Sequence, residues 1–117
     1  MKKNICLLVL LLCTSLLFSE PRIKKGSSFT VMGVFELRTE CGVDKEILYR
    51  TLNHEGGMKV ITLEVGKSET INNVEGLWLQ VLTTAPMWVD TLEWVEKYKT
   101  YWIFLPESTP ITEYEEY

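Results

Sequence analysis

The sequence predicts an all-β fold, a small barrel or sandwich built from short strands. Runs of alternating apolar and polar residues recur along the chain, and turn residues such as Gly56-Gly57 and Asn72-Asn73 separate them. The length of 117 residues allows one domain. The hydrophobic fraction of 46% argues against intrinsic disorder. A net charge of −4 argues against a nucleic-acid partner, since nucleic-acid binding needs a basic face.

The first 19 residues have the layout of a secretory signal peptide. Lys2 and Lys3 precede an apolar run over residues 5–18, which is shorter than the roughly 20 residues of a membrane span. We therefore expect residues 1–19 to be a signal peptide cleaved after Ser19, and the protein to be exported, periplasmic or secreted. Two alternatives stay open, lipidation at Cys13 and an uncleaved anchor, and only these would tie the protein to a membrane.

Both ends of the remaining chain are polar. Residues 20–28 are expected to form a flexible leader, and residues 106–117 an acidic C-terminal tail that is disordered or loosely packed. Cleavage after Ser19 would leave Cys41 as the only cysteine, so the fold must rest on its core rather than on a disulfide. We interpret Cys41 as a small semi-buried residue rather than a reactive thiol.

The strands are expected in the following order. Residues 29–39 are β-rich, residues 41–45 form a loop, and residues 46–52 form a short apolar segment closed by a turn over 53–57. Residues 58–65 form a strand, and Gly66 marks a bulge or turn after it. Strands at 77–83 and 100–105 complete the set. In the strand at 58–65 the better core face is the set Lys59, Ile61, Leu63 and Val65.

Residues 85–99 break the β pattern and have two interpretations. Pro86 is a residue that suits a helix start, and Trp88, Leu92 and Val95 would then share one helical face. The same stretch could form two arms of a long hairpin, with Trp88, Leu92 and Trp94 on one side. Periodicity does not decide between a helix and a hairpin.

Several segments resemble the bacterial SH3 (SH3b) family. They are residues 46–63, Glu-Ile-Leu-Tyr-Arg-Thr-Leu-Asn-His-Glu-Gly-Gly-Met-Lys-Val-Ile-Thr-Leu, with Leu37-Arg38 upstream and Tyr101-Trp102-Ile103-Phe104 at the closing strand. Residues 64–81 are similar to the variant found in exported proteins of spirochaetes and related bacteria. The resemblance implies a small SH3-like barrel over residues 29–105, with residues 85–99 inserted before the last strand. Tyr101 and Gln80 depart from the family pattern, and the insertion alters the surface on which ligand specificity would depend.

Few residues offer catalytic chemistry. His54 is the only histidine, which excludes His-pair metal sites and a two-histidine acid/base scheme. No nucleophile elbow is present, and Gly56-Gly57 lacks the lysine and hydroxyl residue of a phosphate loop. We interpret the carboxylates of Glu93 and Glu96 as solvated charge. The sequence therefore predicts no enzyme, no catalytic residue, no metal and no cofactor.

The aromatic residues point to binding instead. Seven of them fall between Trp78 and Phe104, and a small barrel cannot easily bury so many large rings. Indole rings suit peptide, sugar or protein partners because they offer a large rigid area with one polar N–H. Trp88 and Trp94 are the better candidates for a surface platform, whereas Trp78 and Trp102 are expected in the core or at its rim. The candidate ligand-binding residues are Trp88, Trp94, Tyr49, Trp102 and Trp78, with Tyr49 drawn from the family resemblance.

These observations predict a noncatalytic exported SH3b-like module that binds a peptide, peptidoglycan or protein partner in the cell envelope. By resemblance, the surface would lie between residues 49–54 and the insertion at 85–99. The alternative is a structural or inhibitory envelope protein that docks to one protein partner through that insertion.

Overall fold

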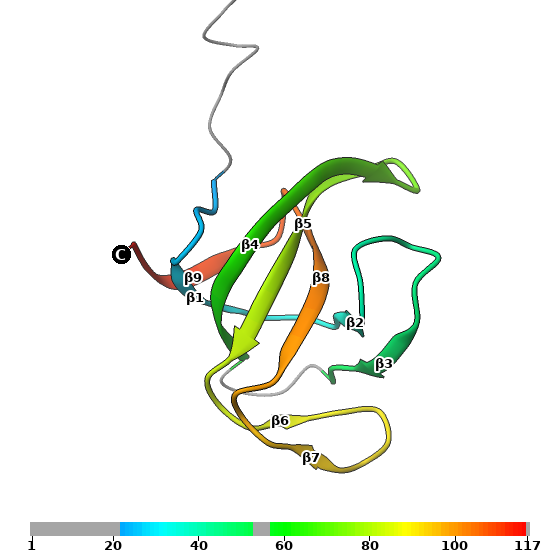
Figure 1. Cartoon of the computed structure of the whole chain (residues 1–117), viewed down its shortest axis with the longest axis vertical. Helices are drawn as coiled ribbons and strands as arrows, with labels where there is room; N and C mark the ends of the chain where they lie inside the picture. The colour runs from blue at the N-terminus through cyan, green and yellow to red at the C-terminus, as the bar shows by residue number, and fades with distance from the viewer. Residues whose placement is uncertain (1–21, 53–56, 117) are drawn as a thin grey trace, which may run out of the picture.

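A computed structural model describes residues 22–52 and 57–116, so the segment 1–19, predicted to be a signal peptide, and His54 lie outside the described residues. The described chain is all-β and contains no helix. Its strands are β1 (Ser28–Val31), β2 (Glu36–Arg38), β3 (Ile47–Arg50), β4 (Met58–Ile71), β5 (Val74–Thr83), β6 (Met87–Trp88), β7 (Trp94–Val95), β8 (Thr100–Pro106) and β9 (Ile111–Glu115). Seven of them form one antiparallel sheet in the order β3-β2-β8-β5-β4-β1-β9, and β6 and β7 form a separate hairpin (Figure 1). The sheet is curved but not closed.

The β4–β5 hairpin contains the two longest strands of the sheet. Asn72 and Asn73 form its turn with φ of 50° and 65°, as a tight two-residue turn between right-twisted strands requires. The pairing shifts register between Val65 and Ser68, so the bulge predicted near Gly66 is confirmed. A Cβ at Gly66 would lie 2.9 Å from the Trp102 ring and 3.0 Å from a backbone oxygen, so this close approach needs glycine.

The core face predicted for β4 is wrong over residues 58–62, whereas Val65 of the predicted set packs against the core. Met58, Val60 and Thr62 are buried, whereas Lys59 is exposed. A second register shift, between Thr62 and Glu64, interrupts the alternation. Because of this shift, Glu64 is exposed although it lies two residues after the buried Thr62. The charge of Glu64 is therefore compatible with burial of the face that carries Met58 and Val60.

The described residues of both ends predicted to be flexible pack against the sheet or join it. Ile23 is fully buried in the core, and β1 begins within the segment predicted to be a flexible leader. The Arg22 guanidinium donates hydrogen bonds to the carbonyls of Pro106 and Glu107, both at 2.8 Å, and of Thr109 at 2.9 Å. The tail expected to be loose forms β9, which pairs antiparallel with β1. β1 therefore has a partner on each side, and the last strand of the sheet is β9 rather than β8.

Candidate functional site

Residues 85–99 form a hairpin, which settles the choice between helix and hairpin. Met87 pairs with Val95, and Trp88 pairs with Trp94. The connection closes with hydrogen bonds from Leu92 N to Val89 O (2.9 Å) and from Val89 N to Glu93 O (3.2 Å). The helical spacing of Trp88, Leu92 and Val95 was therefore coincidental, since Trp88 lies on β6, Val95 on β7 and Leu92 in the connection between them.

The two faces of this hairpin differ sharply in burial. Its inward face carries Met87 and Val95, which join the core together with Val89. On its outward face Trp88 is half-buried and Trp94 is 64% exposed, and their rings meet edge to face with centroids 5.3 Å apart. A recess of about 400 Å³ lies beside Trp94 and is lined by Pro86, Trp94, Val95 and Glu96. We call Trp88 and Trp94, with this recess, the hairpin platform.

The hairpin platform is held to the edge of the sheet at β3. Thr51 forms an isolated β-bridge with Val89, and Leu52 N donates to Trp88 O at 3.2 Å. Arg50 and Asp90 are joined twice, by Asp90 N to Arg50 O at 2.9 Å and by Arg50 N to Asp90 Oδ1 at 3.1 Å. These bonds and the buried inward face fix the hairpin in place before any partner arrives.

The other candidate residues lie elsewhere. Tyr49 on β3 is half-buried and meets the Tyr101 ring edge-on at 6.5 Å. Trp78 on β5 is 1% exposed and tilts against Phe104 with centroids 5.4 Å apart. Trp102 on β8 is half-buried beside Gly66. The five candidate residues thus do not form one site, and only Trp88 and Trp94 lie together on an outward surface.

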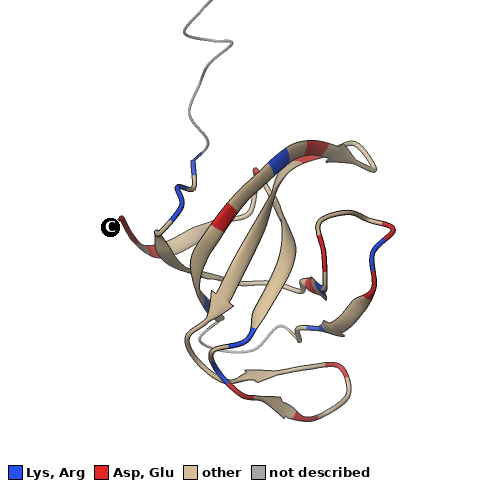
Figure 2. Cartoon of the chain, viewed as in Figure 1, with Lys and Arg blue, Asp and Glu red and all other residues tan. Residues whose placement is uncertain are grey.

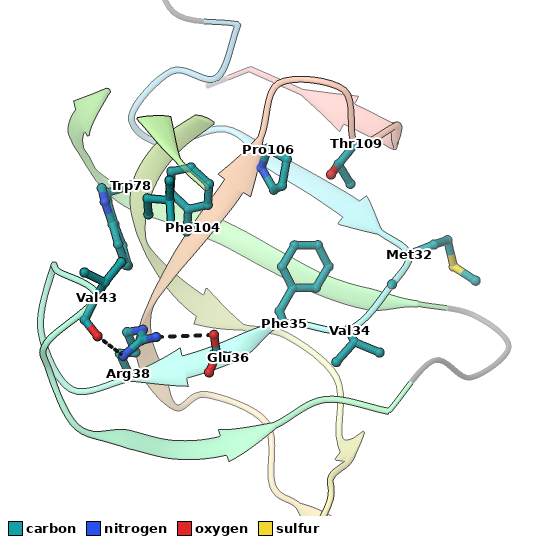
Figure 3. Close-up of a pocket in the computed structure, with 12 residues that line it drawn as sticks. Met32, Val34, Phe35, Glu36, Arg38, Val43, Trp78, Phe104, Pro106 and Thr109 are labelled. Carbon is teal, nitrogen blue, oxygen red and sulfur yellow. Dashed lines mark hydrogen bonds and ion pairs between the residues drawn. The ribbon is translucent and has the colours of Figure 1, made fainter. Parts of the chain in front are cut away.

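A second feature, which the sequence did not reveal, is a cavity of about 330 Å³ between the β1–β2 connection, the loop after β2, and β8. Figure 3 shows Phe35, Trp78 and Phe104 around it, with Met32 and Val43 at its margins. The lining comes from segments that are far apart in the chain, so no sequence pattern marks it.

The charged groups in this cavity are already occupied. The Arg38 guanidinium, only 7% exposed as a residue, donates to the carbonyls of Val43 (3.1 Å) and Lys45 (2.7 Å) and pairs with Glu36 (3.3 Å). Glu36 also pairs with Arg50 at 3.2 Å. Arg38 therefore braces the loop between β2 and β3, and this pair is not free for acid/base work.

The Trp78 indole N–H differs from these paired groups. It is the one buried side-chain nitrogen or oxygen in the described part of the chain that has no hydrogen-bond partner. The cavity thus combines largely apolar walls with one unpaired hydrogen-bond donor on a residue that lines it.

Metal and membrane features were sought in the same residues. Within residues 22–52 and 57–116, no cluster of histidine, cysteine, aspartate and glutamate could hold a metal ion. None of the described residues belongs to a helix able to cross a membrane. Cys41 is a half-buried free thiol.

No family model, curated protein or solved structure matches this chain.

Proposed function

We propose that this protein is a noncatalytic binding module of the cell envelope, and that it docks a peptide, peptidoglycan or protein partner on the hairpin platform. The observation that carries the proposal is the exposure of Trp94, at 64%, on a hairpin whose opposite face is buried in the core. Large exposed aromatic side chains on a fixed surface are typical of binding hot spots.

The rigidity of the platform supports binding as its role. Binding to a mobile loop costs ordering entropy, whereas a surface that is already fixed avoids that cost. Here Met87 and Val95 hold the hairpin from below, and Asp90 holds it from the side through Arg50. The outward indoles can therefore meet a partner with little rearrangement.

The architecture that fits this function is an SH3-like barrel. Support comes from the curved antiparallel sheet and from the segments that resemble SH3b motifs. Residues 46–63 contain β3 and the first part of β4, and residues 101–104 lie within β8. Export is supported by the charged start and apolar run of residues 1–19.

An alternative role is a structural or inhibitory envelope protein that docks to one protein partner through residues 85–99. The size of the recess favours it, since about 400 Å³ holds a side chain or two rather than an extended polymer. The two roles use the same surface and differ in the partner.

A binding assay with purified peptidoglycan and with an envelope-protein extract tests this proposal. Trp94→Ala is compared with Val74→Ala, because Val74 is an exposed apolar residue at the β4–β5 turn, at the opposite end of the molecule (Figure 1). We expect saturable binding that weakens at least about tenfold in Trp94→Ala and is retained in Val74→Ala.

Binding to peptidoglycan would support the module, and saturable binding to a single purified protein would support the alternative. Absence of any Trp94-dependent binding to either would remove both roles. Circular dichroism of each variant checks that the fold is intact.

A further inference from the structure

We propose that the hairpin platform recognises a basic segment of a protein partner, with an arginine or lysine side chain lying on the Trp94 ring and pairing with Glu96. This inference rests on the proposed function and deepens it, because it names the chemistry of the partner.

The first step is the position of Glu96 beside Trp94. Trp94 lies on β7, and Glu96 directly follows this strand. Trp94 and Glu96 also line the same recess. A cation within about 6 Å of the indole centre is therefore close enough to pair with the Glu96 carboxylate.

The second step is the charge of the hairpin. Residues 86–96 contain Asp90, Glu93 and Glu96 but no lysine or arginine, and Lys97 and Lys99 follow them, so the segment 85–99 keeps a net negative charge. Acidic residues lie along the hairpin in Figure 2. Such a surface attracts a basic segment and repels an acidic one.

The third step is that the carboxylate needed is free. Glu36, Glu64 and Glu69 each pair with an arginine or lysine. In contrast, neither Glu93 nor Glu96 forms an ion pair or a side-chain hydrogen bond with any described residue. A partner's cation could therefore form an ion pair with Glu96 without breaking an existing ion pair or side-chain hydrogen bond.

The fourth step compares the Trp94 ring with the ring of Tyr98, four residues further along the chain. Lys97 Nζ lies 5.0 Å from the ring centre of the exposed Tyr98. Within the described residues no cation lies over Trp94, although an indole is the better ring for such contacts. The platform thus presents an exposed indole, the stronger aromatic acceptor, to a cation from a partner.

Binding is measured with labelled synthetic peptides and the full chain. The probes are an alternating Arg-Gly decapeptide, its Glu-Gly counterpart and a neutral peptidoglycan-derived oligosaccharide. Glu96→Gln is the test variant. Glu75→Gln is the matched control, since Glu75 is exposed, has no ion pair among the described residues and gives the same change in net charge.

We expect the Arg-Gly peptide to bind and the Glu-Gly peptide not to bind. Glu96→Gln should weaken Arg-Gly binding about two- to fivefold, the range of an exposed ion pair, and Glu75→Gln should not. Added salt should weaken wild-type binding and narrow the gap between wild type and Glu96→Gln. Equal affinity of wild type and Glu96→Gln, or an equal loss in Glu75→Gln, would overturn the inference.

The two proposals fail in different ways. If only the oligosaccharide binds and this binding needs Trp94, the basic partner is wrong and the proposed function stands. If no probe and no envelope component binds in a Trp94-dependent way, the proposed function falls as well.

Discussion

Trp78 and Trp94 have similar local aromatic contacts and opposite surroundings. Each ring meets one other aromatic ring, Trp78 with Phe104 at 5.4 Å and Trp94 with Trp88 at 5.3 Å. However, Trp78 is 1% exposed and Trp94 is 64% exposed. An aromatic pair therefore does not by itself identify a binding residue. The deciding property is whether other parts of the protein cover the pair.

The difference follows from the place of each strand. β5, which carries Trp78, has β4 on one side and β8 on the other. The loop that Arg38 braces also brings Val43 to the cavity beside Trp78. The β6–β7 hairpin is a separate two-stranded sheet that meets the main sheet near residues 50–52 and buries its inward face. Among the described residues, no element covers the exposed Trp94 ring.

The largest effect expected from this comparison is that of Trp78→Ala. Removing a fully buried indole forfeits its burial and leaves a cavity, which typically costs about 3–5 kcal/mol in the free energy of unfolding. Urea unfolding measures the loss, and Trp78→Phe, which keeps a ring beside Phe104, should lose less. A loss below about 1 kcal/mol in Trp78→Ala would mean that the ring is not a structural support, and the contrast with Trp94 would fail.

Sequence reasoning reached the fold class and several landmarks of this molecule. The all-β class, the turn at Asn72-Asn73 and the bulge near Gly66 follow from local patterns, because turn chemistry and alternation are encoded within a few residues. The face of β4 was missed because a bulge between Thr62 and Glu64 breaks the alternation. That bulge leaves no local sign in the residues around it.

Pairing between strands that are far apart in the chain could not be predicted from the sequence. A polar, proline-containing tail reads locally as disordered, yet Ile111 and Tyr114 pack against the core once β9 pairs with β1. The same limit applies to the site. The pairing of Trp88 with Trp94 across a hairpin could be offered as one of two alternatives, but the cavity between Phe35, Val43 and Trp78 depends on tertiary contacts alone.

A smaller effect on stability is expected for Trp94→Ala. The ring is mostly exposed and loses mainly its edge contact with Trp88, so the free energy of unfolding should fall by no more than about 1 kcal/mol. The same urea titration measures it beside Trp78→Ala. A loss comparable to that of Trp78→Ala would show that the hairpin platform is a structural cap and would undermine its role in binding.

The smallest change in the free energy of unfolding at neutral pH is expected for Tyr101→Phe. This variant also tests the burial of a core side chain through its pH dependence. Burial, followed by the neighbouring Tyr49, raises the pKa of the Tyr101 hydroxyl above its ordinary value of 10.0. The unfolded chain then loses this proton at a lower pH than the folded protein does. The stability linked to this group is therefore complete below pH about 10 and is lost as pH rises through the folded pKa.

Tyr101→Phe removes this linkage and keeps the ring packed. Stability near pH 7 should change little, since both side chains are neutral there and the hydroxyl makes no hydrogen bond with the described residues. Above pH about 10, the variant should lose stability less steeply than the wild type, measured by urea unfolding over a pH series. Lysine titration contributes equally to both proteins, so the difference between the two curves isolates Tyr101. Parallel curves would mean that the packing of Tyr101 does not disfavour its ionised form. The inward side of β8 would then be more open to water than a buried core is, which would weaken the contrast between the covered Trp78 and the exposed Trp94.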